Sequence, residues 1–171
     1  MIVMGIDPGY AIVGYGFISF ARGSYMPVGY GAITTDAGTP FNKRLEHIYK
    51  EMEYLLKLYK PEALAIEKLY FNSNQKTAIY VAEARGVILL AAQLAGVPVY
   101  EYTPLQVKSA VAGYGKATKQ QVMKMTQRLL KLKEIPKPDD TADALGIAIC
   151  HTQAYGSELT KLLIQRGCNK Q

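Results

Sequence analysis

Two short apolar segments that each end in a carboxylate, with a long amphipathic helix between them, constrain this chain most. Residues 1–7 end in Asp7 and residues 63–67 end in Glu67, and both segments fit buried strands. Apolar residues recur at spacings of three and four over 41–59, which predicts a helix. A right-handed crossover through this helix would make the two strands parallel neighbours. Both carboxylates would then lie at the sheet edge where open α/β sheets place their sites.

The other segments predict a mixed five-stranded sheet flanked by helices, an α/β fold. Residues 11–20 and 24–34 are rich in β-branched and aromatic residues and are separated by Arg22-Gly23, which predicts two antiparallel strands. Thr103-Pro104 is typical of a helix N-cap followed by proline at the first helical position. The further predicted elements are helices over 75–95, 104 to about 111, about 118–132 and about 139–155, and a strand over 97–102.

Composition indicates one domain without a zinc site or disulfide framework. The chain has 171 residues, of which 49% are hydrophobic, enough to bury a core. Cys150 and Cys168 lie in no CxxC motif, and the N-terminus lacks the basic region of a signal peptide, so we expect a cytoplasmic protein. The apolar run 86–100 is too interrupted to predict a membrane span. We expect one domain over 1–156 and a poorly ordered tail over 157–171.

The charge distribution favours a polyanionic partner. The net charge is +6, and residues 116–137 hold seven basic residues against the single acid Glu134. Lysines that bind a phosphate backbone, together with carboxylates that bind cations, are typical of a metal-dependent nuclease.

Asp140 and Asp143 add two carboxylates that share one face of the last predicted helix, three residues apart. Each carboxylate also has an alternative explanation. Asp7 fits an Asp-Pro-Gly turn, Glu67 fits an ion pair with Lys68, and Asp140 fits a helix cap. Asp143 is harder to explain structurally, because it lies inside the helix among small apolar residues.

Together the four carboxylates predict a hard, oxygen-rich metal site. Carboxylates suit Mg²⁺, for which Mn²⁺ can substitute, rather than zinc or copper. Two such ions, roughly 3.5–4 Å apart, would clamp the attacking water and the leaving oxygen of a phosphodiester.

Basic residues near the predicted site are candidates for DNA binding. Lys124, Arg128 and Lys131 follow one another at i, i+4 and i+7. A solvated helix face is the alternative explanation, but the excess of one charge sign favours contact with a DNA backbone. Lys119 begins a helix, where a cation is disfavoured, which suggests an external anion. Lys116 ends the loop 113–116, which fits either a phosphate contact or an ordinary connector.

Two apolar features of the sequence each fit two roles, either packing within the chain or contact with a partner. Tyr70 and Phe71 follow Glu67, and either cover the core or stack on an exposed base. The helix over 75–95 is apolar nearly all round, so it has a second contact, with an identical helix across a two-fold axis or with another helix of the chain. His47 and His151 are expected to be structural.

Four segments together resemble the RuvC family of Holliday-junction resolvases. They are GIDPGYAIVGYG, IEKLYFNSNQKTAIYVAEARG, TPLQVKSAVAGYGKATKQQV and PDDTADALGIAI, in the family's order over about residues 1–154. The resemblance implies a ribonuclease-H-like fold, a homodimer, and paired symmetric nicks across a four-way DNA junction with divalent metal. It also implies a branch-migration motor as a partner.

The family's functional residues fall on particular positions of this chain. The metal-binding carboxylates match Asp7, Glu67, Asp140 and Asp143. The essential lysines match Lys108 and Lys119, and the aromatic residue near the junction centre matches Tyr70, where the family often has Phe.

Three other classes of protein share part of this pattern. An actin-like ATPase or sugar kinase also has a strand followed by an Asp-Gly pattern, but needs two such domains and a second phosphate motif. A catalytically dead DNA-binding module of the same fold is disfavoured by the four intact carboxylates. A ribonuclease-H-like nuclease acting on RNA–DNA hybrid remains the alternative, and the long apolar helix and the Lys108/Lys119 pair favour the resolvase.

Overall fold

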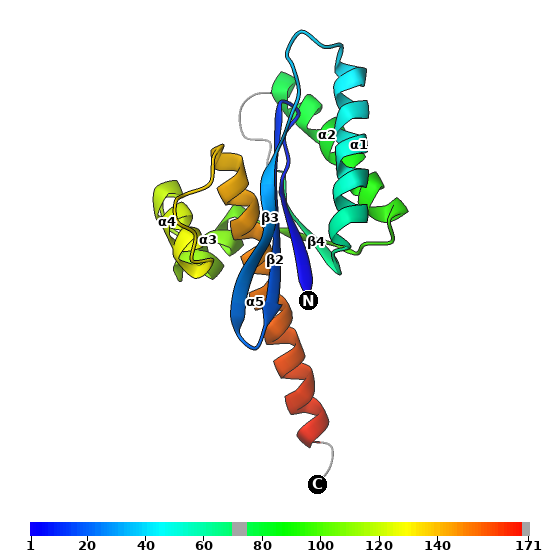
Figure 1. Cartoon of the computed structure of the whole chain (residues 1–171). Helices are drawn as coiled ribbons and strands as arrows, with labels where there is room; N and C mark the ends of the chain where they lie inside the picture. Colours follow the sequence, from blue (N-terminus) through cyan, green and yellow to red (C-terminus); the bar gives the residue numbers. More distant parts are fainter. Residues whose placement is uncertain (70–74, 169–171) are drawn as a thin grey trace.

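A five-stranded mixed sheet forms the centre of the molecule (Figure 1). The computed structural model describes residues 1–69 and 75–168, with side chains for 1–69 and 77–156. The strand order is β3-β2-β1-β4-β5. β1 pairs antiparallel with β2 and parallel with β4, and the second pairing confirms that the two strands ending in carboxylates are parallel neighbours. The strands are β1 (Ile2–Asp7), β2 (Ile12–Ala21), β3 (Ser24–Thr34), β4 (Ala63–Glu67) and β5 (Val99–Tyr102).

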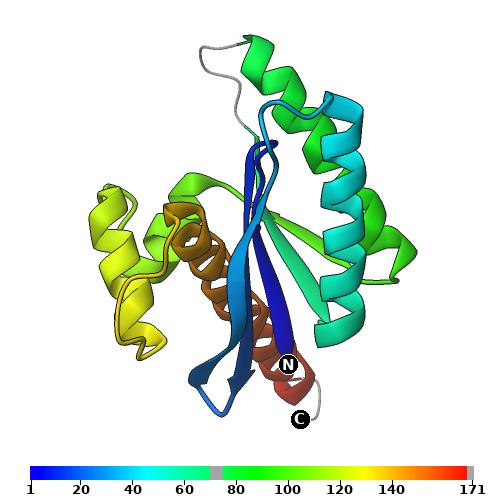
Figure 2. The same cartoon turned by 45° about the horizontal axis from the view of Figure 1, so that its top comes forward.

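Five helices cover the two faces of the sheet. α1 and α2 lie on one side, and α3, α4 and α5 lie on the other (Figures 1 and 2). The Thr103 and Thr118 side chains cap α3 and α4, each in a reciprocal capping box with the glutamine three residues on. The helices are α1 (Phe41–Tyr59), α2 (Gln75–Leu94), α3 (Pro104–Ala112), α4 (Lys119–Leu129) and α5 (Asp139–Cys168).

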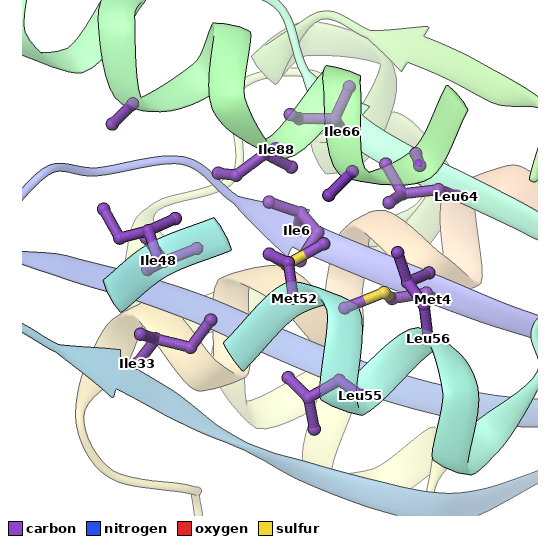
Figure 3. Packing of buried hydrophobic residues seen from close by; sticks show 14 of the residues in the cluster. Met4, Ile6, Ile33, Ile48, Met52, Leu55, Leu56, Leu64, Ile66 and Ile88 are labelled. Atoms are coloured by element: carbon purple, nitrogen blue, oxygen red, sulfur yellow. The ribbon is translucent and has the colours of Figure 1, made fainter. Parts of the chain in front are cut away.

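The face under α1 and α2, called here the bulky face, is packed with large apolar side chains (Figure 3). Met4 and Ile6 of β1 and Leu64 and Ile66 of β4 all point to this side and are fully buried. Alternation along a strand sends the intervening residues to the other side.

The face under α5, called here the close-packed face, has small residues where α5 crosses the middle strands, beside apolar residues such as Val3 and Ile18. Gly5 of β1 pairs with Gly16 of β2 and Ala65 of β4, and α5 packs directly on them. A Cβ atom on Gly5 would lie 2.0 Å from the Ala144 carbonyl oxygen. Only glycine at this position allows α5 to come so close to the sheet.

Two helix boundaries differ from the prediction. α4 ends at Leu129, and Lys131 has a left-handed backbone with φ 52°. Lys131 therefore lies outside the helix, and the predicted stripe with Lys124 and Arg128 at helical spacing was wrong at that position. α5 continues to Cys168, beyond the predicted end near residue 155. The order of the tail over 157–171 stays a prediction.

α2 carries an unusually apolar surface. Its segment Thr77–Leu94 is long and apolar enough to cross a membrane, by length and composition alone, and 22% of it is buried in the molecule. Ala84, Ile88 and Ala92 are buried against the bulky face, whereas Ile79 and Leu90 are more than half exposed. The prediction that one side of this helix packs on the chain and another needs a different contact is consistent with these exposures.

Candidate active site

Strand alternation brings Asp7 and Glu67 to the same end of the close-packed face. Asp7 follows Val3 and Gly5 on that face of β1, and Glu67 follows Ala65 on that face of β4. The register Ile6↔Ile66 places the two carboxylates one residue beyond a parallel pair. Both are half-buried at the carboxyl ends of neighbouring strands, as the sequence predicts.

The first turns of α5 bring Asp140 and Asp143 to the same place. Gly14 of β2 is paired with Asp7, and a Cβ atom there would lie 2.0 Å from the Asp140 carbonyl oxygen. Gly5 makes the same close approach to Ala144 one turn later. The two glycines therefore fix the distance between the strand that carries Asp7 and the helix that carries Asp140 and Asp143.

The other three carboxylates each act on the pKa of Asp7. Desolvation, followed by the charges of Asp143, Glu67 and Asp140, raises the pKa of Asp7 to about 8, although Lys119 opposes the shift. Desolvation and Asp143 raise the pKa of Glu67, against Lys108 and Lys119. Desolvation also raises the pKa of Asp143, although its hydrogen bond with Lys119 acts in the opposite direction. The cluster is thus short of positive charge.

Two lysines line a cavity together with two of these carboxylates, Glu67 and Asp143. Lys119 Nζ lies 2.8 Å from an Asp143 carboxylate oxygen and 4.0 Å from one of Asp139. Lys108 is near enough to Glu67 to influence its pKa. The sequence suggested an external anion for Lys119, whereas here its ammonium pairs with Asp143. Both lysines line a cavity of about 270 Å³, together with Glu67, Asp143, Pro104, Val107, Val122 and Ile147.

The other predicted site residues lie apart from the carboxylates. Lys116, Lys124, Arg128 and Lys131 are exposed and do not line the cavity between Lys108 and Lys119. Tyr70 lies outside the described residues. His151 is buried with its Nδ1 atom 2.8 Å from the Tyr102 hydroxyl, in keeping with the structural role expected of it.

The carboxylate cluster has the chemistry of a site for hard divalent cations. Its donors are all oxygens, they repel one another, and the Lys119 ammonium already lies against one of them. Among the side chains described, no three from His, Cys, Asp and Glu meet at the spacing of ligands to one metal ion. Because the Lys119 ammonium occupies the Asp143 carboxylate, Asp143 could bind a cation only after Lys119 moves away from it.

The glycines that make this arrangement possible were not among the residues predicted for the site. Gly5 and Gly14 occur in GIDPGYAIVGYG, on each side of Asp7. Gly5 lies in β1 and Gly14 lies in the neighbouring strand β2. Glycine inside a predicted strand signals a close backbone approach, so the signal was present.

The fold and the carboxylates supplied by two strands and a helix define the class, a ribonuclease-H-like nuclease fold. The family model for crossover junction endodeoxyribonuclease RuvC matches residues 3–151, so the chain belongs to the RuvC family, a family of metal-dependent nucleases.

Individual proteins similar to this chain carry the same family name. A crossover junction endodeoxyribonuclease RuvC from Brevibacillus brevis is 58% identical over 153 residues, covering 90% of this chain and 92% of that protein. The one from Clostridioides difficile is 52% identical over 163 residues, covering 95% of each. The structure of T. thermophilus RuvC in complex with Holliday junction substrate has a TM-score of 0.85 at 38% identity, covering 89% of this chain and 93% of that one.

Proposed function

We propose that this chain resolves Holliday junctions as a Mg²⁺-dependent endonuclease that makes paired symmetric nicks. The observation that carries the proposal is the convergence of four carboxylates from β1, β4 and α5 beside two lysines, in a member of the RuvC family. The solved relative bound to a Holliday junction, at 38% identity over most of both chains, supports the substrate.

In the proposed mechanism, Asp7, Glu67, Asp140 and Asp143 would hold two Mg²⁺ ions, for which Mn²⁺ can substitute. Bound there, such ions would supply Lewis-acid stabilisation for phosphodiester hydrolysis. Lys119 leaves Asp143 and donates to the scissile phosphate, where it stabilises the charge that develops in the transition state. Lys108, beside Glu67, positions the same phosphate from α3.

DNA away from the scissile bond is held by a separate set of residues. Lys116, Lys124, Arg128 and Lys131 are exposed on the loop before α4, on α4 and just after it, on the same side of the sheet as the carboxylates. Side chains of this kind neutralise backbone phosphates without reading the base sequence. Tyr70 is proposed to stack at the junction centre on the strength of the family motif alone.

A homodimer is proposed to form through the exposed side of α2. Ile79, Glu83, Gly86 and Leu90 lie on this side, at successive spacings of four, three and four residues. Nothing lies within 4 Å of the Cβ position of Gly86, so a second helix has room to approach there. That spacing is typical of a helix packed against another helix. Two copies related by a two-fold axis would place two active sites on one symmetric junction.

The dimer is tested with Leu90→Glu, which places a charge on the proposed interface. We expect sedimentation velocity to show a monomer for this variant and a dimer for the wild type. Leu58→Glu on α1 is the matched control, because Leu58 is equally exposed but lies on another helix. A wild-type protein that sediments as a monomer at micromolar concentration would contradict the proposed interface.

The activity is tested with a labelled mobile four-way junction, with and without Mg²⁺. We expect paired nicks at symmetric positions in opposing strands only when Mg²⁺ is present. Matched linear duplex and RNA–DNA hybrid substrates are the controls. Faster cutting of the hybrid than of the junction would replace this proposal with the hybrid-nuclease alternative.

Three further expectations accompany the proposal. A cytoplasmic location and a partnership with a branch-migration motor are supported by membership of a family that acts on DNA junctions. Residues 1–156 are proposed as the nuclease domain, with 157–171 as a tail.

A further inference from the structure

The buried guanidinium of Arg44 is a charge that the proposed chemistry does not use. Arg44 lies on α1 with 8% of its surface exposed. Among the side chains that the structure describes, no carboxylate forms an ion pair with it. Burial of a charge is unfavourable unless hydrogen bonds compensate, so the partners of this guanidinium indicate what it does.

Arg44 binds the turn that follows Asp7. Its Nη2 atom donates to the Tyr10 carbonyl oxygen at 3.1 Å, and its Nε atom donates to the Thr35 hydroxyl at 2.8 Å. The Thr35 hydroxyl in turn donates to the same Tyr10 carbonyl at 2.7 Å. The guanidinium also lies 4.8 Å from the centre of the Tyr10 ring, at the distance of a cation–π contact.

These contacts join three segments of the chain at one point. The Thr35 N–H donates to the Ala11 carbonyl at 2.9 Å, so the residue after β3 holds both Tyr10 and Ala11. The Tyr10 ring contacts Phe41 of α1 and Tyr80 of α2, with ring centres 6.2 and 5.5 Å away. The turn between β1 and β2 is therefore fastened to the start of both helices that cover the bulky face.

The position of the β1–β2 turn matters because Asp7 directly precedes it. Tyr10 is three residues after Asp7, and the turn is tight enough that a Cβ atom on Gly9 would lie 2.1 Å from the Ile12 carbonyl oxygen. Asp7 faces three other carboxylates, which repel it. The backbone at the end of β1 must resist that repulsion if Asp7 is to stay in the cluster.

We propose that Arg44 is a positioning residue that holds the β1–β2 turn, and through it the Asp7 carboxylate, in the geometry needed to bind divalent cations. The proposal rests on the proposed function, because it takes Asp7 as a metal ligand. Arg44 acts from the opposite side of the sheet, without contact with the metal or the DNA.

The test compares Arg44→Met, Arg44→Lys and Thr35→Val with the wild type. Mn²⁺ affinity is measured by calorimetry without DNA, and cleavage of saturating junction is followed as Mg²⁺ is raised. We expect Arg44→Met to lower Mn²⁺ affinity roughly 10-fold, the usual effect of losing a group that orients a ligand. Higher Mg²⁺ should restore its cutting rate, and junction affinity should be unchanged. Arg44→Lys should recover part of the loss, since an ammonium can still donate to Tyr10.

The controls separate the possible failures. Lys50→Met on α1 removes an exposed charge paired with Glu46 and should leave Mn²⁺ affinity unchanged. If Arg44→Met does not fold, the Mn²⁺ affinity of Thr35→Val tests the proposal instead. This variant removes only the hydroxyl between Arg44 and Tyr10. A lowered melting temperature with wild-type Mn²⁺ affinity in the deciding variant would overturn the proposal. Asp7→Asn with wild-type Mn²⁺ affinity would instead overturn the proposed metal site itself.

Discussion

The two faces of the same sheet differ in the size of their side chains, and the difference explains where the candidate site lies. β1 sends Met4 and Ile6 to the bulky face, and Gly5 and Asp7 to the close-packed face. Large side chains on the first face hold α1 and α2 at an ordinary packing distance. On the second face, glycine lets the backbone of α5 approach the strands directly.

Both faces stabilise the fold, but only the close-packed face carries the candidate site. Each face buries an apolar cluster, and apolar burial is the dominant favourable term in folding. The close-packed face gathers four carboxylates that repel one another, and this opposes folding until cations bind. Substitutions on the bulky face should thus lower stability and leave cutting normal, whereas substitutions on the close-packed face should lower cutting.

The largest expected effect is on cutting by Asp143→Asn. We expect the cutting rate to fall by more than about 100-fold, since even groups that only orient metal ligands can matter that much. Junction affinity and the circular dichroism spectrum should remain those of the wild type, because lysines hold the DNA. Ile66→Val on the bulky face is the control, with a loss of about 1 kcal/mol of stability and normal cutting. Substantial Mg²⁺-dependent cutting by Asp143→Asn would remove this carboxylate from the site.

The next largest effect is expected for Gly5→Ala, which breaks the close packing itself. The new Cβ atom would meet backbone atoms of Ala144 and Ala148, which cannot rotate away. We expect a loss of about 3 kcal/mol in urea denaturation, at the upper end for overpacking, together with loss of cutting. In Gly31→Ala the new atom meets the end of the Tyr15 side chain, which can move. Equal losses for both variants would show that the closeness of α5 has no special role.

This division also explains how much the sequence alone could predict. The apolar segments that end in Asp7 and Glu67 and the helical spacing of Asp140 and Asp143 are local patterns, so the parallel pairing of β1 with β4, the antiparallel pairing of β2 with β3 and the choice of the four carboxylates as candidates could be read from the sequence. The partner of Lys119 was not, because its contact with Asp143 depends on how α4 packs against α5. Arg44 gave no signal either, since in the sequence it is one more basic residue of an amphipathic helix.

Metal binding by the close-packed face should depend on pH. With a pKa of about 8, Asp7 is largely protonated at neutral pH without cations, so metal binding must release its proton. Because the pKa of Asp7 is raised, its proton competes with the cation below that pKa. Mn²⁺ affinity should therefore rise with pH up to about 8 and then level off. We expect about a tenfold gain in Mn²⁺ affinity per pH unit between 6 and 7.5. Asp7→Asn should abolish that slope, and a wild-type affinity that did not vary with pH would contradict the raised pKa.

The smallest expected effect tests whether only one side of the sheet faces DNA. Lys124 is exposed on α4, on the side of the carboxylates, and Lys50 is exposed on α1, on the opposite side. Each phosphate contact adds to the salt dependence of binding, so Lys124→Ala should reduce the slope of log K against log salt by about 1. It should weaken junction and duplex binding alike, and leave the cutting rate at saturating junction unchanged. Lys50→Ala removes the same charge and should not alter the slope. If the two variants reduced it equally, the loss would reflect net charge, and the side of α4 would not be the DNA-binding side.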